Sequence, residues 1–187
     1  MRYVIMKTEI NIDRGYFMSE KTMAGSSARK SIVDEMCESY TLYGVSVVVS
    51  RALPDVRDGM KPVHRHILDV LFNRYPSTSP YRKSARAVGE IMGELHPHGD
   101  DAIYKSMINM SQDWRTSLPF VDIQGNNGSM DGDMPAAMRY TEARTTSVAD
   151  LVLGDLKLMD PKRPDMVDNY DKTIKTPVVM PCRIPNI

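Results

Sequence analysis

The stretch YRKSARAVGEIMGELHPHGDDAIYKSMINM, residues 81–110, decides the fold. The apolar residues of its first half are Ala85, Val88, Met92 and Leu95. Their helical spacing predicts a helix that ends at the turn HPHG. Asp100 follows this turn and is expected to cap a second helix, whose apolar face is formed by Ile103, Met107 and Met110. A helix, a four-residue turn and another helix have the spacing of a helix-turn-helix unit.

The residues after this pair are expected to add a β-hairpin and a long helix. Residues 120–123 predict a short strand, and the turn-dense GNNGSMDGD (residues 125–133) is expected to close a hairpin. A hairpin directly after a helix-turn-helix unit would form a wing. A long helix is then predicted from Pro135, with Asp133 as its cap, and it carries Tyr140, Val148, Leu151, Val152 and Leu156.

Two further helices are predicted upstream. One begins near Ser31 and runs into a β-branched stretch at residues 45–49. RALPDVRDGMKP (residues 51–62) forms a loop, because its prolines and glycine interrupt regular structure. Pro62 suits the first position of a helix, and the apolar face of that helix is formed by Val63, Ile67, Val70 and Leu71.

Composition and charge narrow the class of protein. The 187 residues include 24 basic and 24 acidic residues and are 42% hydrophobic, which is ordinary for a globular protein. Residues 61–86 nevertheless hold six Lys or Arg against one Asp, so a nucleic-acid surface is a candidate. No apolar run reaches the length of a membrane span, and no secretory signal is visible. Cys37 and Cys182 lie far apart, which favours a reducing, cytosolic setting without a disulfide framework.

Three groups of residues bear on cofactors. The histidines of HRH (residues 64–66) and HPH (residues 96–98) have no neighbouring Cys or carboxylate at zinc spacing, so a structural metal is not expected. Asp131 and Asp133 could hold a divalent ion, although turn and cap roles explain both. The sequence has no GxxxxGK[ST] phosphate loop, so this chain is not expected to hydrolyse ATP.

The strongest local chemistry is the pair Arg139–Tyr140, which Glu142 and Arg144 follow closely. A phenol has a pKa near 10 and is a poor nucleophile unless cations stabilise its phenolate or its transition state. Beside a guanidinium and a basic surface, Tyr140 could attack a phosphodiester. The alternative is a core tyrosine on an amphipathic helix, with Arg139 in a surface ion pair. These residues alone favour the alternative.

Three long motifs in series favour Tyr140 as a nucleophile over a core tyrosine. RALPDVRDGMKPVHRHIL (51–68), YRKSARAVGEIMGELHPHGDDAIY (81–104) and GNNGSMDGDMPAAMRYTEAR (125–144) closely resemble the A subunit of bacterial type IIA DNA topoisomerases, which are gyrase and topoisomerase IV. The resemblance runs from about Ser39 to the last residue. Details such as MSQDW and YRKSARAVG look closer to topoisomerase IV than to gyrase.

The resemblance implies roles for individual residues. Tyr140, in RYTE, matches the tyrosine that attacks the DNA backbone, leaves a 5′-phosphotyrosyl link and frees a 3′-hydroxyl. The residues implied to support it by stabilising the transition state are Arg139, Arg51 and His98. The positions implied to bind DNA are Lys61, His64, Arg65, Lys83, Ser84 and Arg86.

The resemblance also implies a fold and partners. It implies an α+β, mainly helical chain: a winged-helix DNA-cleavage domain over residues 31–156, then the truncated start of a tower domain over residues 157–187. Residues 1–30 are expected to form a poorly ordered N-terminal arm. The implied partners are a second copy of the A subunit, the B subunit and double-stranded DNA. No association with a membrane is implied. Mg²⁺ and ATP are expected on the B subunit, not on this chain, and the location is expected to be cytoplasmic, at the nucleoid.

The sequence departs from the family pattern at several places. Asp101 and Lys105 stand where the family usually has a serine and an acid, the two positions that anchor fluoroquinolones through a metal-water bridge. His66 stands where the family has a second arginine after KPVHR. Because the resemblance covers only an early part of the subunit, the chain is expected to be a fragment that does not turn over alone. The alternatives are a gyrase A fragment, a winged-helix DNA-binding protein without catalysis, and a remnant that no longer folds well.

Overall fold

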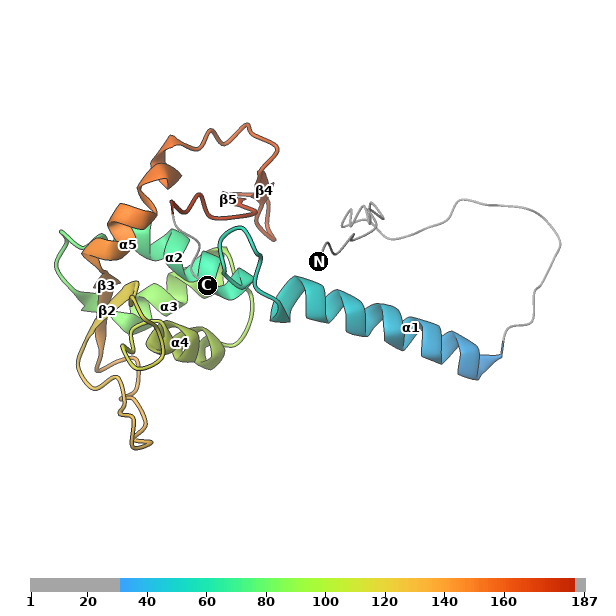
Figure 1. The fold of residues 1–187 in the computed structure, drawn as a ribbon, viewed down its shortest axis with the longest axis horizontal. Helices are drawn as coiled ribbons and strands as arrows, with labels where there is room; N and C mark the ends of the chain where they lie inside the picture. The colour runs from blue at the N-terminus through green and yellow to red at the C-terminus, as the bar shows by residue number, and fades with distance from the viewer. Residues whose placement is uncertain (1–30, 184–187) are drawn as a thin grey trace, which may run out of the picture. The chain divides into compact units, whose positions relative to one another are not determined.

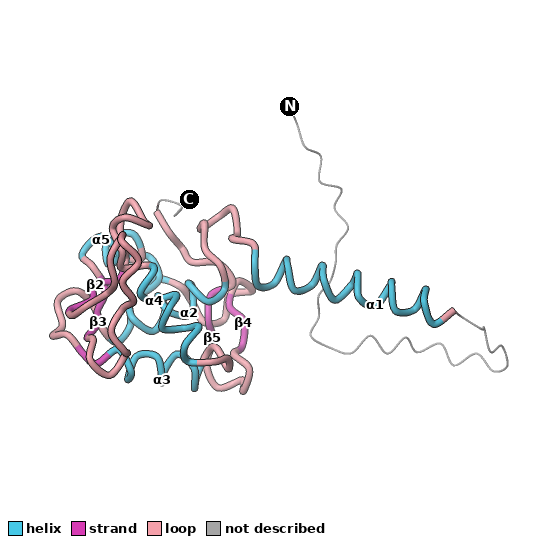
Figure 2. Tube along the Cα trace, turned by 90° about the horizontal axis from the view of Figure 1, so that it is seen from below, coloured by secondary structure: helices cyan, strands magenta, loops and turns pink. Residues whose placement is uncertain are grey.

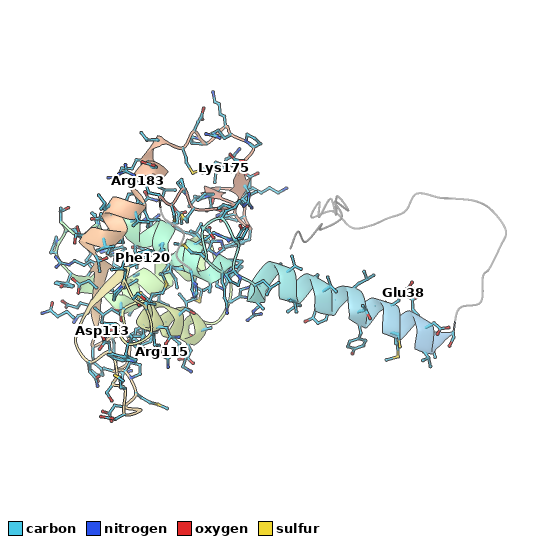
Figure 3. All side chains as sticks on the ribbon, in the orientation of Figure 1. Glu38, Asp113, Arg115, Phe120, Lys175 and Arg183 are labelled. Atoms are coloured by element: carbon cyan, nitrogen blue, oxygen red, sulfur yellow. The ribbon has the colours of Figure 1, made fainter. Side chains whose placement is uncertain are left out.

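The computed structural model describes residues 31–183, and the arm predicted over residues 1–30 lies outside them. The chain divides into two units, residues 1–39 and residues 40–187. Helix α1 (Ile32–Val47) spans the boundary and confirms the helix predicted from Ser31. None of its residues is buried, and its side chains stand out along the helix, Glu38 among them (Figure 3). The β-branched run after it continues as the π-helix η1 (Val48–Ala52).

Three helices form the centre of the second unit. They are α2 (Pro62–Arg74), α3 (Ser84–Glu94) and α4 (Asp100–Asn109), and each packs against the other two (Figure 1). These bounds confirm the helix expected at Pro62 and the two helices predicted on either side of the HPHG turn. The fully buried side chains between the helices include Ile67, Leu68, Leu71, Ile91, Ile103 and Met107. Burial of these apolar side chains is the main source of stability for this layer.

Two local predictions within this pair are wrong. Asp100 is the first residue of α4 and Gly99 is the cap, while the Asp100 carboxylate accepts a hydrogen bond from the Asp101 amide instead. Met92 is 38% exposed and Ile91 is fully buried, so the buried face of α3 is rotated from the predicted one. The turn after α3 places Leu95 in the core, and this fixes which face of the helix is covered.

A small antiparallel sheet covers one end of the helices. Its strands are β1 (Arg82–Lys83), β2 (Val121–Gln124) and β3 (Glu142–Thr145), in the order β1-β3-β2. Val121 lies opposite Thr145, and Gln124 lies opposite Glu142. The strand predicted at residues 120–123 is therefore confirmed with a shift of one residue. GNNGSMDGD lies in the connection between β2 and β3, as a hairpin would require.

The long helix predicted from Pro135 is wrong. Residues 134–141 form an irregular loop with a turn, β3 follows, and the helix that does form is the short α5 (Ser147–Val152). Pairing of Glu142–Thr145 with both neighbouring strands satisfies the backbone there, and this tertiary pairing overrides the helical spacing of the apolar residues. The cap of α5 is Thr146, whose hydroxyl accepts the amide of Ala149, and Asp133 caps no helix.

The last described segment returns to the helices. After the short 3₁₀ helix η2 (Gly154–Leu158), strands β4 (Met166–Asp168) and β5 (Lys175–Pro177) pair antiparallel. The two sheets lie at opposite ends of the helical layer (Figure 2). Met180 then enters the same core as the helices. The described chain is thus a mixture of helices and open sheets, as the α+β prediction requires, and none of its helices in residues 31–183 has the length and apolar character to cross a membrane.

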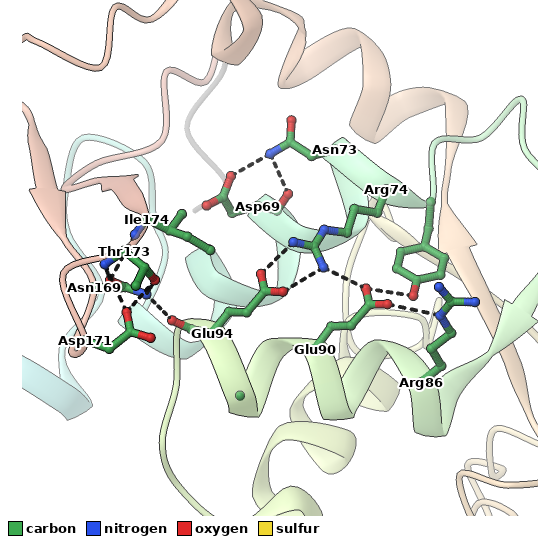
Figure 4. Close-up of polar contacts among 12 residues, drawn as sticks. Asp69, Asn73, Arg74, Arg86, Glu90, Glu94, Asn169, Asp171, Thr173 and Ile174 are labelled. Atoms are coloured by element: carbon green, nitrogen blue, oxygen red, sulfur yellow. Dashed lines mark hydrogen bonds and ion pairs between the residues drawn. The ribbon is translucent and has the colours of Figure 1, made fainter.

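Figure 4 shows how the β4–β5 hairpin is attached to α3. The side-chain nitrogen Nδ2 of Asn169 donates to the carbonyl of Glu94 at 2.6 Å, and the Tyr170 hydroxyl donates to the carbonyl of Gly93. The side-chain oxygen of Asn169 accepts the amides of Thr173 and Ile174 and so closes the hairpin turn. The hairpin therefore satisfies carbonyl groups that the end of α3 leaves without helical partners.

Candidate functional site

Tyr140 lies at the surface, in the loop between β2 and β3. Its side chain is 66% exposed, and its amide donates to the carbonyl of Ala137 at 2.8 Å to close a turn. The guanidinium carbon of Arg139 lies 4.7 Å from the centre of the Tyr140 ring, within range of a cation–π contact. The alternative of a core tyrosine on an amphipathic helix is therefore wrong, because Tyr140 is neither buried nor helical.

A chain of buried hydroxyl groups holds this loop from below. The Thr141 hydroxyl donates to Ser84 Oγ at 2.9 Å, and the Tyr104 hydroxyl oxygen lies 2.9 Å from Thr141 Oγ1. Tyr104 also donates to the carbonyl of Ala136 at 2.6 Å. Helices α3 and α4 thus both contact the loop that carries Tyr140.

Two backbone hydrogen bonds attach the same loop to the start of α3. The amides of the first helical turn have no partners within the helix. Here the amide of Ser84 donates to the carbonyl of Thr141 at 3.0 Å, and that of Ala85 donates to the carbonyl of Met138 at 3.1 Å. The loop therefore performs the capping role that a side chain would otherwise have, since no side chain caps α3.

A groove of about 510 Å³ lies between α4 and this loop. Asp101 and Lys105 line one side of it and Arg139 lines the other. Lys105 Nζ lies 2.6 Å from Asp101 Oδ2, and both side chains are exposed. The two positions that the resemblance associates with drug contact therefore form an ion pair with each other at the edge of the groove.

His98 belongs to a cluster of three imidazoles. The Nδ1 atoms of His66 and His96 lie 3.2 Å apart, and the rings of His96 and His98 meet edge to face with centroids 4.5 Å apart. Burial, together with the charges of His98 and Arg51, lowers the pKa of His96 to about 4, so His96 is neutral at pH 7. His98 is exposed at the outer end of the cluster, and Arg51 is exposed on η1. His66, which stands in place of a family arginine, is thus partly buried against His96.

The KPVHR residues do not all face solvent. Lys61 is exposed, but Arg65 is 11% exposed, with its Nε 2.5 Å from Asp58 Oδ2 and an Nη donating to the carbonyl of Met60. Burial and the nearby Lys61 and Arg65 charges lower the pKa of the half-buried His64, so His64 is neutral at pH 7. Phosphate binding by Arg65 stays a prediction, and in this structure the buried Asp58 carboxylate holds its guanidinium.

The KSAR residues divide in the same way. Lys83 pairs with Glu142 and Arg86 pairs with Glu90, and both basic side chains are more than half exposed. Ser84 is fully buried and its hydroxyl accepts a hydrogen bond from Thr141, while its predicted DNA contact stays a prediction. Lys83 and Arg86 keep surface positions suited to phosphate contacts.

The structure brings some of the predicted catalytic residues together and leaves others apart. Arg139 lies over Tyr140, and Arg51 is close enough to the histidine cluster to affect the pKa of His96. Across residues 31–183, no hydrogen bond, ion pair or ring contact joins Tyr140 to Arg51 or His98. The described chain thus presents two separate groups of catalytic candidates.

Sequence reasoning missed the residues that support these groups. Asp58, which is fully buried, also accepts the amides of Met60 and Met180 and so joins the RALPD loop to the end of the described chain. The signal in the sequence was the acid directly before Gly59. In the structure Gly59 has a positive φ of 68°, which marks a tight turn. Thr141 and Tyr104 carried no visible signal beyond the adjacency of Thr141 to Tyr140.

Fold and site together define a class: an α+β domain with two helices joined by the HPHG turn, an antiparallel strand pair after them and an exposed Arg–Tyr pair on the connecting loop. Comparison with known proteins gives the family. The family model for the A subunit of DNA gyrase and topoisomerase IV matches residues 51–187. The chain belongs to this family.

Curated relatives agree with the family model. The chain is 53% identical over 160 residues to the DNA gyrase A subunit of Staphylococcus epidermidis, a match that covers 84% of this chain and 18% of the relative. It is 48% identical over 159 residues to the DNA gyrase A subunit of Thermotoga maritima, with 84% and 19% covered, and 52% identical over 158 residues to that of Rickettsia typhi, with 84% and 17% covered. The chain therefore spans less than a fifth of the length of these relatives.

Proposed function

We propose that this segment is the DNA breakage and rejoining part of a type IIA topoisomerase A subunit, with Tyr140 as the nucleophile. The observation that carries the proposal is the exposure of Tyr140 beside Arg139, on a loop fixed by two helices. A tyrosine that belonged to the core would bury its ring or its hydroxyl. Membership of the family supports the same conclusion.

The proposed step exchanges one phosphodiester for another. Tyr140 Oη attacks a backbone phosphorus and loses its proton, the new Oη–P bond forms, and the bond from phosphorus to the 3′ oxygen breaks. That oxygen leaves as a 3′-hydroxyl after it takes up a proton. Because a P–O ester bond is conserved, the reverse step rejoins the DNA without ATP.

The proposed role of the cations is to stabilise the transition state. Negative charge gathers on the non-bridging oxygens as phosphorus becomes five-coordinate, and guanidinium groups bind such oxygens with two parallel donors. Arg139 lies next to the nucleophile, and Arg51 and His98 are proposed as further donors. A single fixed donor of this kind contributes a factor of about 10²–10³ in rate.

We further propose that the working site requires an assembly. In this chain Tyr140 is not in contact with Arg51 or His98, which supports completion of the site by association of two A subunits with two B subunits and double-stranded DNA. Mg²⁺ and ATP are assigned to the B subunit; no step above uses them. The proposed place of action is the cytoplasm, at the nucleoid.

The choice between topoisomerase IV and gyrase stays open in this proposal. The motifs resemble topoisomerase IV more closely, whereas the relatives named above are gyrase A subunits and the family model covers both. Decatenation and negative supercoiling are therefore equally supported as the reaction of the complete enzyme.

The second candidate is a DNA-binding protein without catalysis, and the helix-turn-helix pair favours it. The test splices residues 40–187 into the Staphylococcus aureus relative, which is 52% identical over 160 residues, and adds its B subunit, Mg²⁺ and supercoiled plasmid. We expect linear DNA with bound protein after detergent, and none with Tyr140→Phe. Tyr81→Phe is the matched control. Equal DNA binding without cleavage by the folded chimera would support the non-catalytic candidate.

A further inference from the structure

Thr141 takes part in several of the contacts that fix the Tyr140 loop. Its hydroxyl bridges Ser84 on α3 and Tyr104 on α4, at 2.9 Å to each, and its carbonyl accepts the Ser84 amide at 3.0 Å. Ser84 and Thr141 are fully buried, and Tyr104 is nearly so. Buried hydroxyl groups that are all paired specify one geometry, because an unpaired one in the interior is costly.

The other contacts of the loop include the Ala136 amide, which donates to the Asn126 carbonyl at 3.0 Å, and Met138, which packs against the core. Residues 134–141 have no helix or strand of their own, and Met134 and Tyr140 are exposed. Tyr104 reaches both ends of the turn, with its hydroxyl on the Ala136 carbonyl and beside Thr141 Oγ1. The turn that presents Tyr140 is therefore set by side chains of two different helices.

We propose that Thr141 and Tyr104 are positioning residues for Tyr140: their hydroxyl groups fix the 136–141 turn so that the phenol is presented at a defined place on the surface. The proposal rests on the proposed function for its catalytic consequence, and on the structure alone for the fixing of the turn. Neither residue touches the reacting atoms. A displacement of about 1 Å in a catalytic group is enough to lower a rate by about 10²-fold.

The variants remove hydroxyl groups and keep shape. Thr141→Val and Tyr104→Phe delete them, and Thr141→Ser restores one. The matched controls are Thr145→Val and Tyr75→Phe, which delete buried hydroxyl groups paired elsewhere, with Asp150 and Glu90. Each control removes a hydrogen bond outside the Tyr140 loop. Because these bonds go to carboxylates, the controls are expected to lose at least as much melting temperature as the test variants.

The first measurement uses the chain itself and needs no activity. Amide hydrogen exchange at Ser84 and Ala85 reports the two bonds to the loop carbonyls. We expect exchange there to accelerate about tenfold in Thr141→Val and Tyr104→Phe, as for the loss of one hydrogen bond, and to stay unchanged in the controls and in Thr141→Ser. Unchanged exchange in Thr141→Val would overturn the proposal.

The second measurement uses the chimeric enzyme with its B subunit. At saturating DNA, we expect the cleavage rate constant to fall about 10- to 100-fold in Thr141→Val, with DNA affinity within twofold, and to recover in Thr141→Ser. Equal losses in the Thr145→Val control would show a purely structural role and overturn the proposal. If the parent chimera cleaves no DNA, the proposed function fails, and hydrogen exchange still decides whether the two hydroxyl groups fix the turn.

Discussion

Removal of the Asp58 carboxylate tests how much the buried contacts of Asp58 contribute to the stability of the chain. Asp58 is fully buried, holds Arg65 in a 2.5 Å ion pair and accepts the amides of Met60 and Met180. Asp58→Ala leaves a guanidinium that is 11% exposed without its partner. Breaking a buried pair from one side costs about 3–5 kcal/mol, so we expect a loss of that size in the free energy of unfolding.

The assay is urea and thermal unfolding of the 187-residue chain. A loss of that size corresponds to a fall of about 10 °C in melting temperature for a chain of this length. Asp55→Ala is the control, because its partner Arg57 is mostly exposed, and it is expected to cost at most about 1 kcal/mol. The double variant Asp58→Ala/Arg65→Met is expected to recover about 2 kcal/mol, because it removes the unpaired charge. A loss below about 1 kcal/mol in Asp58→Ala would refute the reasoning.

Three further predictions concern drug response, pH and the hairpin. Lys105→Glu in the chimeric enzyme is expected to lower the fluoroquinolone concentration for half-maximal cleavage, because the resemblance implies a drug-bound metal ion at this position and the Lys105 ammonium would repel it; an unchanged value would contradict this. Burial raises the pKa of Asp69 to about 6, so the native state binds its proton more tightly than the unfolded state, and the penalty for ionising it is complete above pH 6 and disappears toward pH 4. Asp69→Asn should therefore stabilise the chain by about 1–3 kcal/mol at pH 7 and much less at pH 4.5, whereas equal gains at both pH values in urea unfolding would refute the assignment. Asn169→Ala removes the bond to the Glu94 carbonyl and the two bonds that close the hairpin turn. We therefore expect the free energy of unfolding to fall by about 1–3 kcal/mol and amide exchange in β4 and β5 to become faster. Asp171→Ala, at an exposed residue, is the milder control, and equal effects of the two variants would contradict the prediction.

The central helices could be predicted because their apolar residues repeat with a single period. Pro62 marked the start of α2, and HPHG marked the turn between α3 and α4. The end of α3 and the first residue of α4 differ from expectation by a residue because the turn itself enters the core through Leu95. Local spacing thus gives the existence of a helix, and tertiary packing gives its exact face.

The region around Tyr140 could not be predicted in this way. The apolar residues after Pro135 have a helical spacing, but strand pairing of Glu142–Thr145 with β2 determines the local structure. Strand pairing links residues about twenty positions apart, and no local pattern reports it. The exposure of Tyr140, which distinguishes a nucleophile from a core residue, follows from this pairing.

In the candidate site, the sequence predicted which residues are present but not which other residues they contact. Motifs located Tyr140, Arg139, Arg51 and His98, but they did not indicate that Arg65 and Ser84 are used internally. Whether a basic or hydroxyl side chain is paired within the fold depends on a partner elsewhere in the chain, here Asp58 for Arg65 and Thr141 for Ser84. Such partners are visible only when the fold brings them together.

The most direct test of the central claim is to locate the bond between protein and DNA. The chimeric A subunit, with its B subunit, Mg²⁺ and plasmid, is stopped with detergent; the adduct is digested with nuclease and protease, and the peptides are read by mass spectrometry. We predict a phosphorylated nucleotide remnant on Tyr140, with the 5′ ends of the cut DNA blocked and the 3′ ends free. A remnant on another residue, blocked 3′ ends, or an adduct that persists in Tyr140→Phe would contradict the assignment of Tyr140 as the nucleophile.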